Sequence, residues 1–103
     1  MSLNENEIEQ EIQDKGLTAP RLTPALIDAQ INYCEYFRVT NTTVTICAIV
    51  LQNGFTVIGE SAAVSMENFN KELGEKIAKD NAREKIWALE GYLLKDKLFK
   101  KEM

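Results

Sequence analysis

The pattern of hydrophobic and polar positions divides the chain into a strand-like middle and helix-like flanks. Three segments in the middle are rich in β-branched and aromatic residues, which favour extended strands. Asn53-Gly54 joins the second segment to the third and is typical of a two-residue hairpin turn, because both turn positions need a positive φ. The pattern therefore predicts a three-stranded antiparallel meander. Its strands are residues 33–40, 43–51 and 55–62.

Apolar residues at helical spacing dominate the segments before and after these strands. Asn4 and Glu7 have the spacing of a capping box. Thr23-Pro24 suits an N-cap followed by the first helical residue, and Ser65 is a suitable N-cap for the last helix. The predicted helices are residues 4–15, 23–32 and 65–100.

The predicted fold class is α+β: a three-stranded antiparallel meander with N-terminal helices and a long C-terminal helix packed across one sheet face. We expect residues 1–20 to form a flexible acidic arm, or a short helix plus linker, and residues 21–103 to form a single α+β domain. Gly91 leaves open whether the long helix continues or breaks. A chain of 103 residues can build such a core without disulfides or metal.

One face of the predicted sheet is uniformly apolar. A two-residue loop places Ala48 opposite Gly59, which makes the middle of this face flat. Gly74, Ala78 and Ala82 form a ridge of small residues along the long helix. We expect this ridge to lie on the flat face, although packing against another helix stays open. The expected core face comprises Phe37, Val39, Val44, Ile46, Ala48, Val50, Phe55 and Val57.

The other face carries the residues with the most chemistry. The same register makes Cys47 and Glu60 cross-strand neighbours. If the first turn, at Asn41-Thr42, also has two residues, Tyr36 lies across from Cys47 and Arg38 across from Thr45. One interpretation is a ligand or catalytic cluster, and the other is a half-covered face with a surface ion pair worth about 0–1 kcal/mol. We favour the second, because a cysteine nucleophile needs an adjacent base and a neighbouring carboxylate raises the pKa of a thiol.

Composition narrows the chemistry further. The chain has no histidine, which removes the usual general base and the usual zinc ligand, so we expect no metal and no cofactor. Its net charge of −4 makes nucleic acid an unlikely partner. The longest apolar run, residues 46–51, is far too short for a membrane span, and residues 1–20 lack a signal-peptide pattern. We therefore expect no membrane association, a cytoplasmic protein, and Cys34 and Cys47 as reduced, packed thiols.

Apolar side chains outside the expected core indicate association with another chain. They lie on the second sheet face and on a helix end that we expect to project beyond the body. The lysines there, Lys95, Lys97, Lys100 and Lys101, complement the helix dipole. A small domain rarely exposes this much apolar surface, so we expect a homodimer or higher homo-oligomer. The candidate interaction surface comprises Tyr36, Arg38, Ile49, Leu51, Ile58, Glu60, Leu94, Leu98 and Phe99.

Three stretches of the sequence are distinctive in combination. They are NGFTVIGESA at 53–62, ENF at 67–69 and AREKIWALEGYLL at 82–94. With these motifs the chain resembles a family of small tailed-phage and prophage proteins, known from gene product forty-nine of one coliphage and gene sixty-six of a Shigella phage. The resemblance implies a phage gene expressed in the host bacterial cytoplasm, and it supplies no established activity, cofactor or catalytic residue.

Three functional hypotheses follow. We favour a non-enzymatic phage accessory protein that binds a host or phage protein, because no catalytic constellation is visible. The alternative is a nucleic-acid-associated phage protein, suggested by the lysines near residue 100. The least favoured is a small enzyme using Cys47, Glu60 and Arg38.

Overall fold

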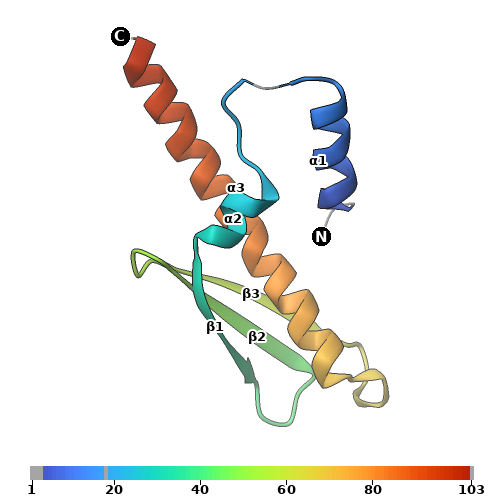
Figure 1. Ribbon diagram of the computed structural model, residues 1–103. Coiled ribbons are helices and arrows are strands. Elements are labelled where there is room, and N and C mark those ends of the chain that lie inside the picture. The colour runs from blue at the N-terminus through green and yellow to red at the C-terminus, as the bar shows by residue number, and fades with distance from the viewer. Residues whose placement is uncertain (1–3, 18, 103) are drawn as a thin grey trace.

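A computed structural model describes residues 4–17 and 19–102. It confirms the α+β class, with a three-stranded antiparallel sheet in the order β1-β2-β3. The last helix crosses the sheet on the side of β2 and β3 (Figure 1). The elements are α1 (Glu5–Asp14), α2 (Pro24–Ala29), β1 (Ile31–Arg38), β2 (Val44–Leu51), β3 (Thr56–Ala62), the short 3-10 helix η1 (Met66–Asn68) and α3 (Lys71–Glu102).

Capping side chains set where the helices begin. The Asn4 side chain accepts hydrogen bonds from the backbone N–H groups of Asn6 and Glu7, which confirms Asn4 as the N-cap, and Glu7 accepts from the side-chain amide of Asn4. Thr23 caps α2 in the same way. The long helix was expected from Ser65 but begins at Lys71, because Asn70 accepts the N–H of Leu73 and serves as the cap.

The turn between β2 and β3 is one residue longer than the sequence suggests. The N–H of Leu51 donates to the carbonyl of Phe55 at 2.8 Å, and the N–H of Gly54 donates to the carbonyl of Leu51 at 2.9 Å. These bonds enclose a three-residue loop in which Gly54 takes the positive φ, at 91°. The predicted two-residue turn is therefore wrong, although the hairpin itself is confirmed.

This extra loop residue shifts the pairing of β3 by one position. Gly59 lies opposite Cys47, where the two-residue loop would place it opposite Ala48. Because neighbouring strand residues point to opposite faces, the shift moves every side chain of β3 to the other face relative to β2. Val57 and Gly59 consequently share a face with Cys47 and Ile49.

The core lies on the face that we expected to be half-covered. Residues 45, 47, 49 and 51 of β2 are buried, whereas residues 44, 46, 48 and 50 remain partly exposed. The expected core face is therefore wrong for β1 and β2, and only Val57 of that set is buried. The buried hydrophobic residues are Ile27, Cys47, Ile49, Leu51, Val57, Ala78, Ala82 and Ile86.

Close approach between α3 and the sheet determines which sheet face the helix covers. A Cβ atom on Gly59 would overlap the backbone nitrogen of Ala82 and the carbonyl oxygen of Ala78. A Cβ atom on Gly74 would lie 2.9 Å from Oγ1 of Thr45. The ridge of small residues on the helix is thus confirmed to pack on the sheet, and the small residue that receives it is Gly59.

The molecule is elongated because α3 is longer than the sheet. Its 32 residues span about 48 Å, and the eight residues of β2 span about 27 Å. The helix continues without a break at Gly91, and its C-terminal part projects past the β2–β3 turn (Figure 1). The radius of gyration is 16.5 Å, compared with about 13 Å for a compact chain of this length.

Candidate functional site

The cluster of reactive side chains expected on one face is divided between two faces. Tyr36 lies opposite Cys47 and Arg38 lies opposite Thr45, which confirms those two pairings. Glu60 lies opposite Ile46 and belongs to the other face. The predicted neighbourhood of Cys47 and Glu60 is therefore wrong, because the three-residue loop moves Glu60 across the sheet.

The helix-covered face disfavours thiolate chemistry. Cys47 is fully buried, and burial raises the pKa of its thiol to about 11, with smaller contributions from neighbouring Cys34. Burial also raises the pKa of Tyr36 to about 12. Both cysteines are free thiols. At neutral pH Cys47 and Tyr36 are therefore protonated, and a protonated thiol is a poor nucleophile.

Arg38 is occupied by contacts within the chain. Its guanidinium carbon lies 3.9 Å above the centre of the Phe69 ring. Its Nε donates to the carbonyl of Thr42 at 3.0 Å. These contacts tie the end of β1 to the segment before α3, so Arg38 has a structural role here.

The structure divides the predicted interaction residues into three groups. Ile49 and Leu51 are 0% and 5% exposed under α3, so the expectation that they form a surface is wrong. Leu94 and Leu98 are partly buried. The third group is exposed and comprises Tyr36, Arg38, Ile58, Glu60 and Phe99.

The second face of the sheet is apolar and open. Along its centre run the partly exposed residues of β2, from Val44 through Ile46 and Ala48 to Val50. We call this surface the open face. Its outer strands add large exposed side chains, with Phe37 52% exposed. Paired across the three strands, its rows are Tyr33–Val50–Thr56, Glu35–Ala48–Ile58 and Phe37–Ile46–Glu60.

Sequence reasoning found the residues of this face but assigned them to the core. The alternation along β2 shows that both faces are apolar, so it does not say which one the helix covers. The turn length decides that, because it determines which face receives Gly59. The same Asn53-Gly54 pair is also compatible with a three-residue loop that ends in Gly54, and that loop would have predicted the correct face.

The projecting part of α3 carries a second set of exposed apolar side chains. Leu89, Tyr92, Leu93 and Phe99 are all exposed, and Tyr92 is the most exposed of them at 74%. Leu89, Tyr92 and Leu93 line one wall of a groove whose other wall is the end of β2, the β2–β3 turn and the first residues of β3. We call residues 89–102 the helix extension.

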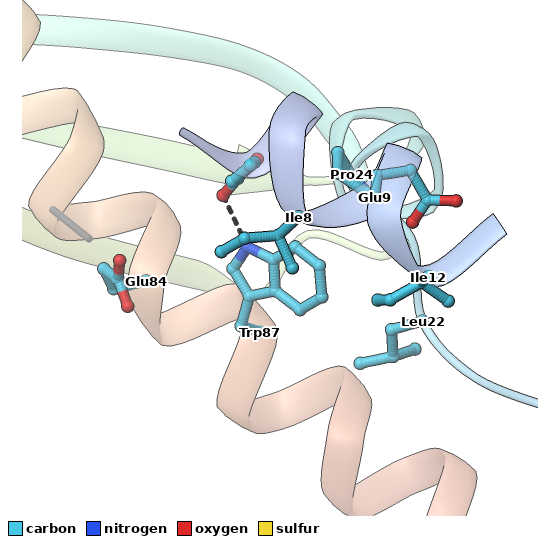
Figure 2. A pocket seen from close by; sticks show the side chains of 8 residues that line it. Ile8, Glu9, Ile12, Leu22, Pro24, Glu84 and Trp87 are labelled. Atoms are coloured by element: carbon cyan, nitrogen blue, oxygen red, sulfur yellow. Dashed lines mark hydrogen bonds between the residues drawn. The ribbon is translucent and has the colours of Figure 1, made fainter. Parts of the chain in front are cut away.

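A partly buried ion pair attaches α1 to α3, and sequence reasoning missed it. Figure 2 shows Trp87 beneath α1, with Ile8 over its ring. The Glu5 carboxylate accepts hydrogen bonds from Nε1 of Trp87 at 3.0 Å and from the guanidinium of Arg83. Arg83 also pairs with Asp28 at 2.9 Å. The spacing of Arg83 and Trp87, one helical turn apart, was the only available hint.

A second charged contact holds the middle of α1. Arg21 donates two hydrogen bonds of 2.7 Å to the Glu9 carboxylate. This pairing, with a smaller contribution from Gln13, lowers the pKa of Glu9 to about 2. The acidic helix α1 therefore packs on two arginines, Arg21 before α2 and Arg83 on α3.

The family model that describes this chain covers residues 22–98 and is described as the phage protein (N4 Gp49/phage Sf6 gene 66) family. The chain belongs to this family. The matched residues include α2, the whole sheet and α3 as far as Leu98, and they leave out α1. No curated protein and no solved structure matches the chain. The resemblance noted from the sequence motifs is thus confirmed.

Metal-ligand clusters and membrane-spanning helices are both absent from the part of the chain that the structure describes. Within residues 4–17 and 19–102, no three histidine, cysteine or carboxylate side chains gather as metal ligands would. None of the helices in that part of the chain combines the length and the apolar character that a membrane crossing needs.

Proposed function

We propose that the protein is a non-enzymatic phage accessory protein that acts in the host bacterial cytoplasm by binding another polypeptide, and that the open face is its binding surface. The observation that carries this proposal is an apolar sheet face that no helix covers within the described residues. Antiparallel sheets that face water usually alternate apolar and polar residues. Here the central strand is apolar on both faces.

The large exposed side chains of the open face are grouped around β2. Tyr33, Phe37 and Ile58 are each about half exposed, and they surround the apolar centre of β2. Contiguous apolar patches of this kind on small proteins are typical of protein-interaction sites. Aromatic side chains are also the residues that contribute most to binding energy at such sites.

The charges on this face indicate the chemistry of the partner. Glu35 lies on β1 and Glu60 lies on β3, so one carboxylate flanks each side of the apolar central strand. A partner that suits this arrangement has an apolar stripe with cations on both sides. The same two carboxylates oppose the phosphates of nucleic acid.

The buried, protonated thiol of Cys47 supports a binding role over catalysis. Cys47 has a raised pKa, and Glu60 lies on the opposite face, so neither group is placed to activate the other. Free cysteines suit the reducing conditions of a bacterial cytoplasm.

Site-specific photo-crosslinking tests the proposal. The photoreactive residue p-benzoylphenylalanine replaces Phe37 on the open face, and a matched control replaces Leu26, which is 48% exposed on α2. In infected cells we expect a discrete polypeptide adduct from position 37 and none from position 26. Equal labelling at both positions, or no polypeptide adduct at position 37, would contradict the proposal.

A further inference from the structure

We infer that the open face binds the helix extension of a second copy of this chain, so that two copies exchange their helix ends around a two-fold axis. The inference rests on the proposed function, because it names the occupant of the same surface. Three independent features of the described residues support it: the direction of the exposed side chains, the lengths of helix and sheet, and the charges.

The exposed side chains of the helix extension continue the face of α3 that packs on its own sheet. At 100° per residue, Tyr92 has the same angular position as Gly74, which lies 18 residues earlier. Leu89 lies within about 20° of Ala78, and Leu93 within about 20° of Ala82. The sheet side of the helix therefore changes from small residues to large ones where the sheet ends.

The lengths of the two elements match. The helix outruns the sheet by roughly 20 Å, and the open face of a second copy is about 27 Å long. If two sheets lie end to end with their β2–β3 turns adjacent, each helix covers its own sheet first and then the other copy's open face. A two-fold axis makes both contacts at once and closes the assembly.

The charges are complementary. Lys95 and Lys97 precede and follow Asp96, so they lie about 100° to either side of it around the helix. Asp96 itself is neutralised by Lys100 at 2.9 Å. One flank of the helix extension carries Lys97 and Lys101 beside Glu90 and is net cationic, and the other carries Lys95 beside Glu102. The open face offers Glu35 and Glu60 on its two flanks. Lysine side chains can extend from an apolar stripe to such carboxylates.

Light scattering with single variants tests the inference first. We expect the full chain to have twice its mass of 11.7 kDa at tens of micromolar. Tyr92→Glu, at the most exposed apolar position of the helix extension, should weaken dimerisation at least about tenfold. The matched control is Leu73→Glu, which makes the same kind of change at a 55% exposed position on α3 and should leave the dimer intact.

Mixing two variants tests the exchange itself. Phe37→Glu damages the open face and Tyr92→Glu damages the helix extension, so each variant alone should be monomeric. An equimolar mixture should associate, because the intact helix extension of the first variant can bind the intact open face of the second. Circular dichroism establishes that both variants are folded, and the exposed single position Ile58→Glu replaces Phe37→Glu if the latter unfolds.

The outcomes separate this inference from the proposed function. A monomeric full chain at hundreds of micromolar, or a dimer that Tyr92→Glu leaves intact, overturns the helix exchange. If position 37 then crosslinks to a different polypeptide in cells, the open face is still a binding surface and the proposed function stands. If position 37 crosslinks to nothing, both are wrong.

Discussion

The two faces of the sheet have similar hydrophobicity and different surroundings. On β2, Cys47 and Ile49 lie under α3, while their neighbours Ile46 and Ala48 on the other side remain partly exposed. Hydrophobicity alone does not separate these positions. The difference lies in shape, because Gly59 on β3 gives the covered face a place where a helix backbone can approach.

The two halves of α3 also differ in side-chain size, according to whether the helix packs closely on the sheet. Where the helix meets its own sheet, it presents Gly74, Ala78 and Ala82. At the end of the sheet, the same side presents large residues such as Tyr92. Side-chain size on one helix face therefore reports how far away the opposing surface lies.

The largest expected effect comes from filling the close contact on the covered face. Gly59→Ala should destabilise the fold by about 3 kcal/mol or more, because the new Cβ overlaps the backbone of α3, which has little freedom to move. The neighbouring Ile58→Ala, on the open face, should cost less than about 1 kcal/mol because its side chain is 51% exposed. Urea unfolding of both variants measures the difference, and equal costs would mean that the two faces are not distinguished as described.

A pair of glycines on α3 sharpens the comparison along the helix. Gly74→Leu should cost about 1–3 kcal/mol, since even its Cβ would lie 2.9 Å from Thr45. Gly91→Ala should instead stabilise by up to about 1 kcal/mol, because its Cβ meets only Leu22 at an ordinary 3.8 Å and alanine favours helix. Thermal unfolding of the two variants tests this opposite sign, and a neutral Gly74→Leu would place residue 74 away from the sheet.

The buried thiol predicts how the covered face responds to pH. Because the pKa of Cys47 is raised in the folded protein to about 11, the unfolded chain loses this proton first as pH rises. Stability should therefore be constant below the ordinary thiol pKa and decrease as pH rises towards 11. Urea unfolding at a series of pH values should show a smaller decrease for Cys47→Ala. Rapid alkylation of Cys47 in the folded protein at pH 7 would contradict its burial.

The smallest effect concerns the attachment of α1, away from both faces. Glu5→Gln removes the charge that pairs with Arg83 and accepts from Trp87, so the indole should become more exposed and its emission should shift to longer wavelength. Trp87 is the only tryptophan, which makes the signal specific. Glu11→Gln is the matched control, because Glu11 pairs with exposed Lys15 at the C-cap of α1, and it should leave the emission unchanged. The same shift in both variants would show that the Glu5 contact does not hold α1.

Much of the fold was predictable because its signals are local. The N-cap at Asn4, the hairpin near Gly54 and the small-residue ridge at Ala78 each depend on a few neighbouring residues, and each is confirmed. The pairings of Tyr36 with Cys47 and of Arg38 with Thr45 were also correct. These parts depend on turn and helix chemistry that a single sequence displays.

Two features could not be predicted from the sequence: which sheet face α3 covers, and the contact between α1 and α3. Asn-Gly suits both a two-residue loop and a three-residue loop, and that one-residue choice determined which face α3 covers. Because the turn length was predicted wrongly, Ile49 and Leu51 were predicted to lie on the surface and Ile46 in the core, and the structure shows the reverse. The contact of Glu5 with Arg83 spans 78 residues, and periodicity gives no information about such pairs.

The most direct test of the central claim is a crosslink from the helix extension. Full-length protein carrying p-benzoylphenylalanine at Phe99 is mixed with an equal amount of ¹⁵N-labelled protein, irradiated and digested. The helix exchange predicts crosslinked peptides of mixed isotope that join position 99 to open-face residues of β1, β2 or β3. Crosslinks confined to single-isotope pairs, or mixed pairs that never include the open face, would contradict it.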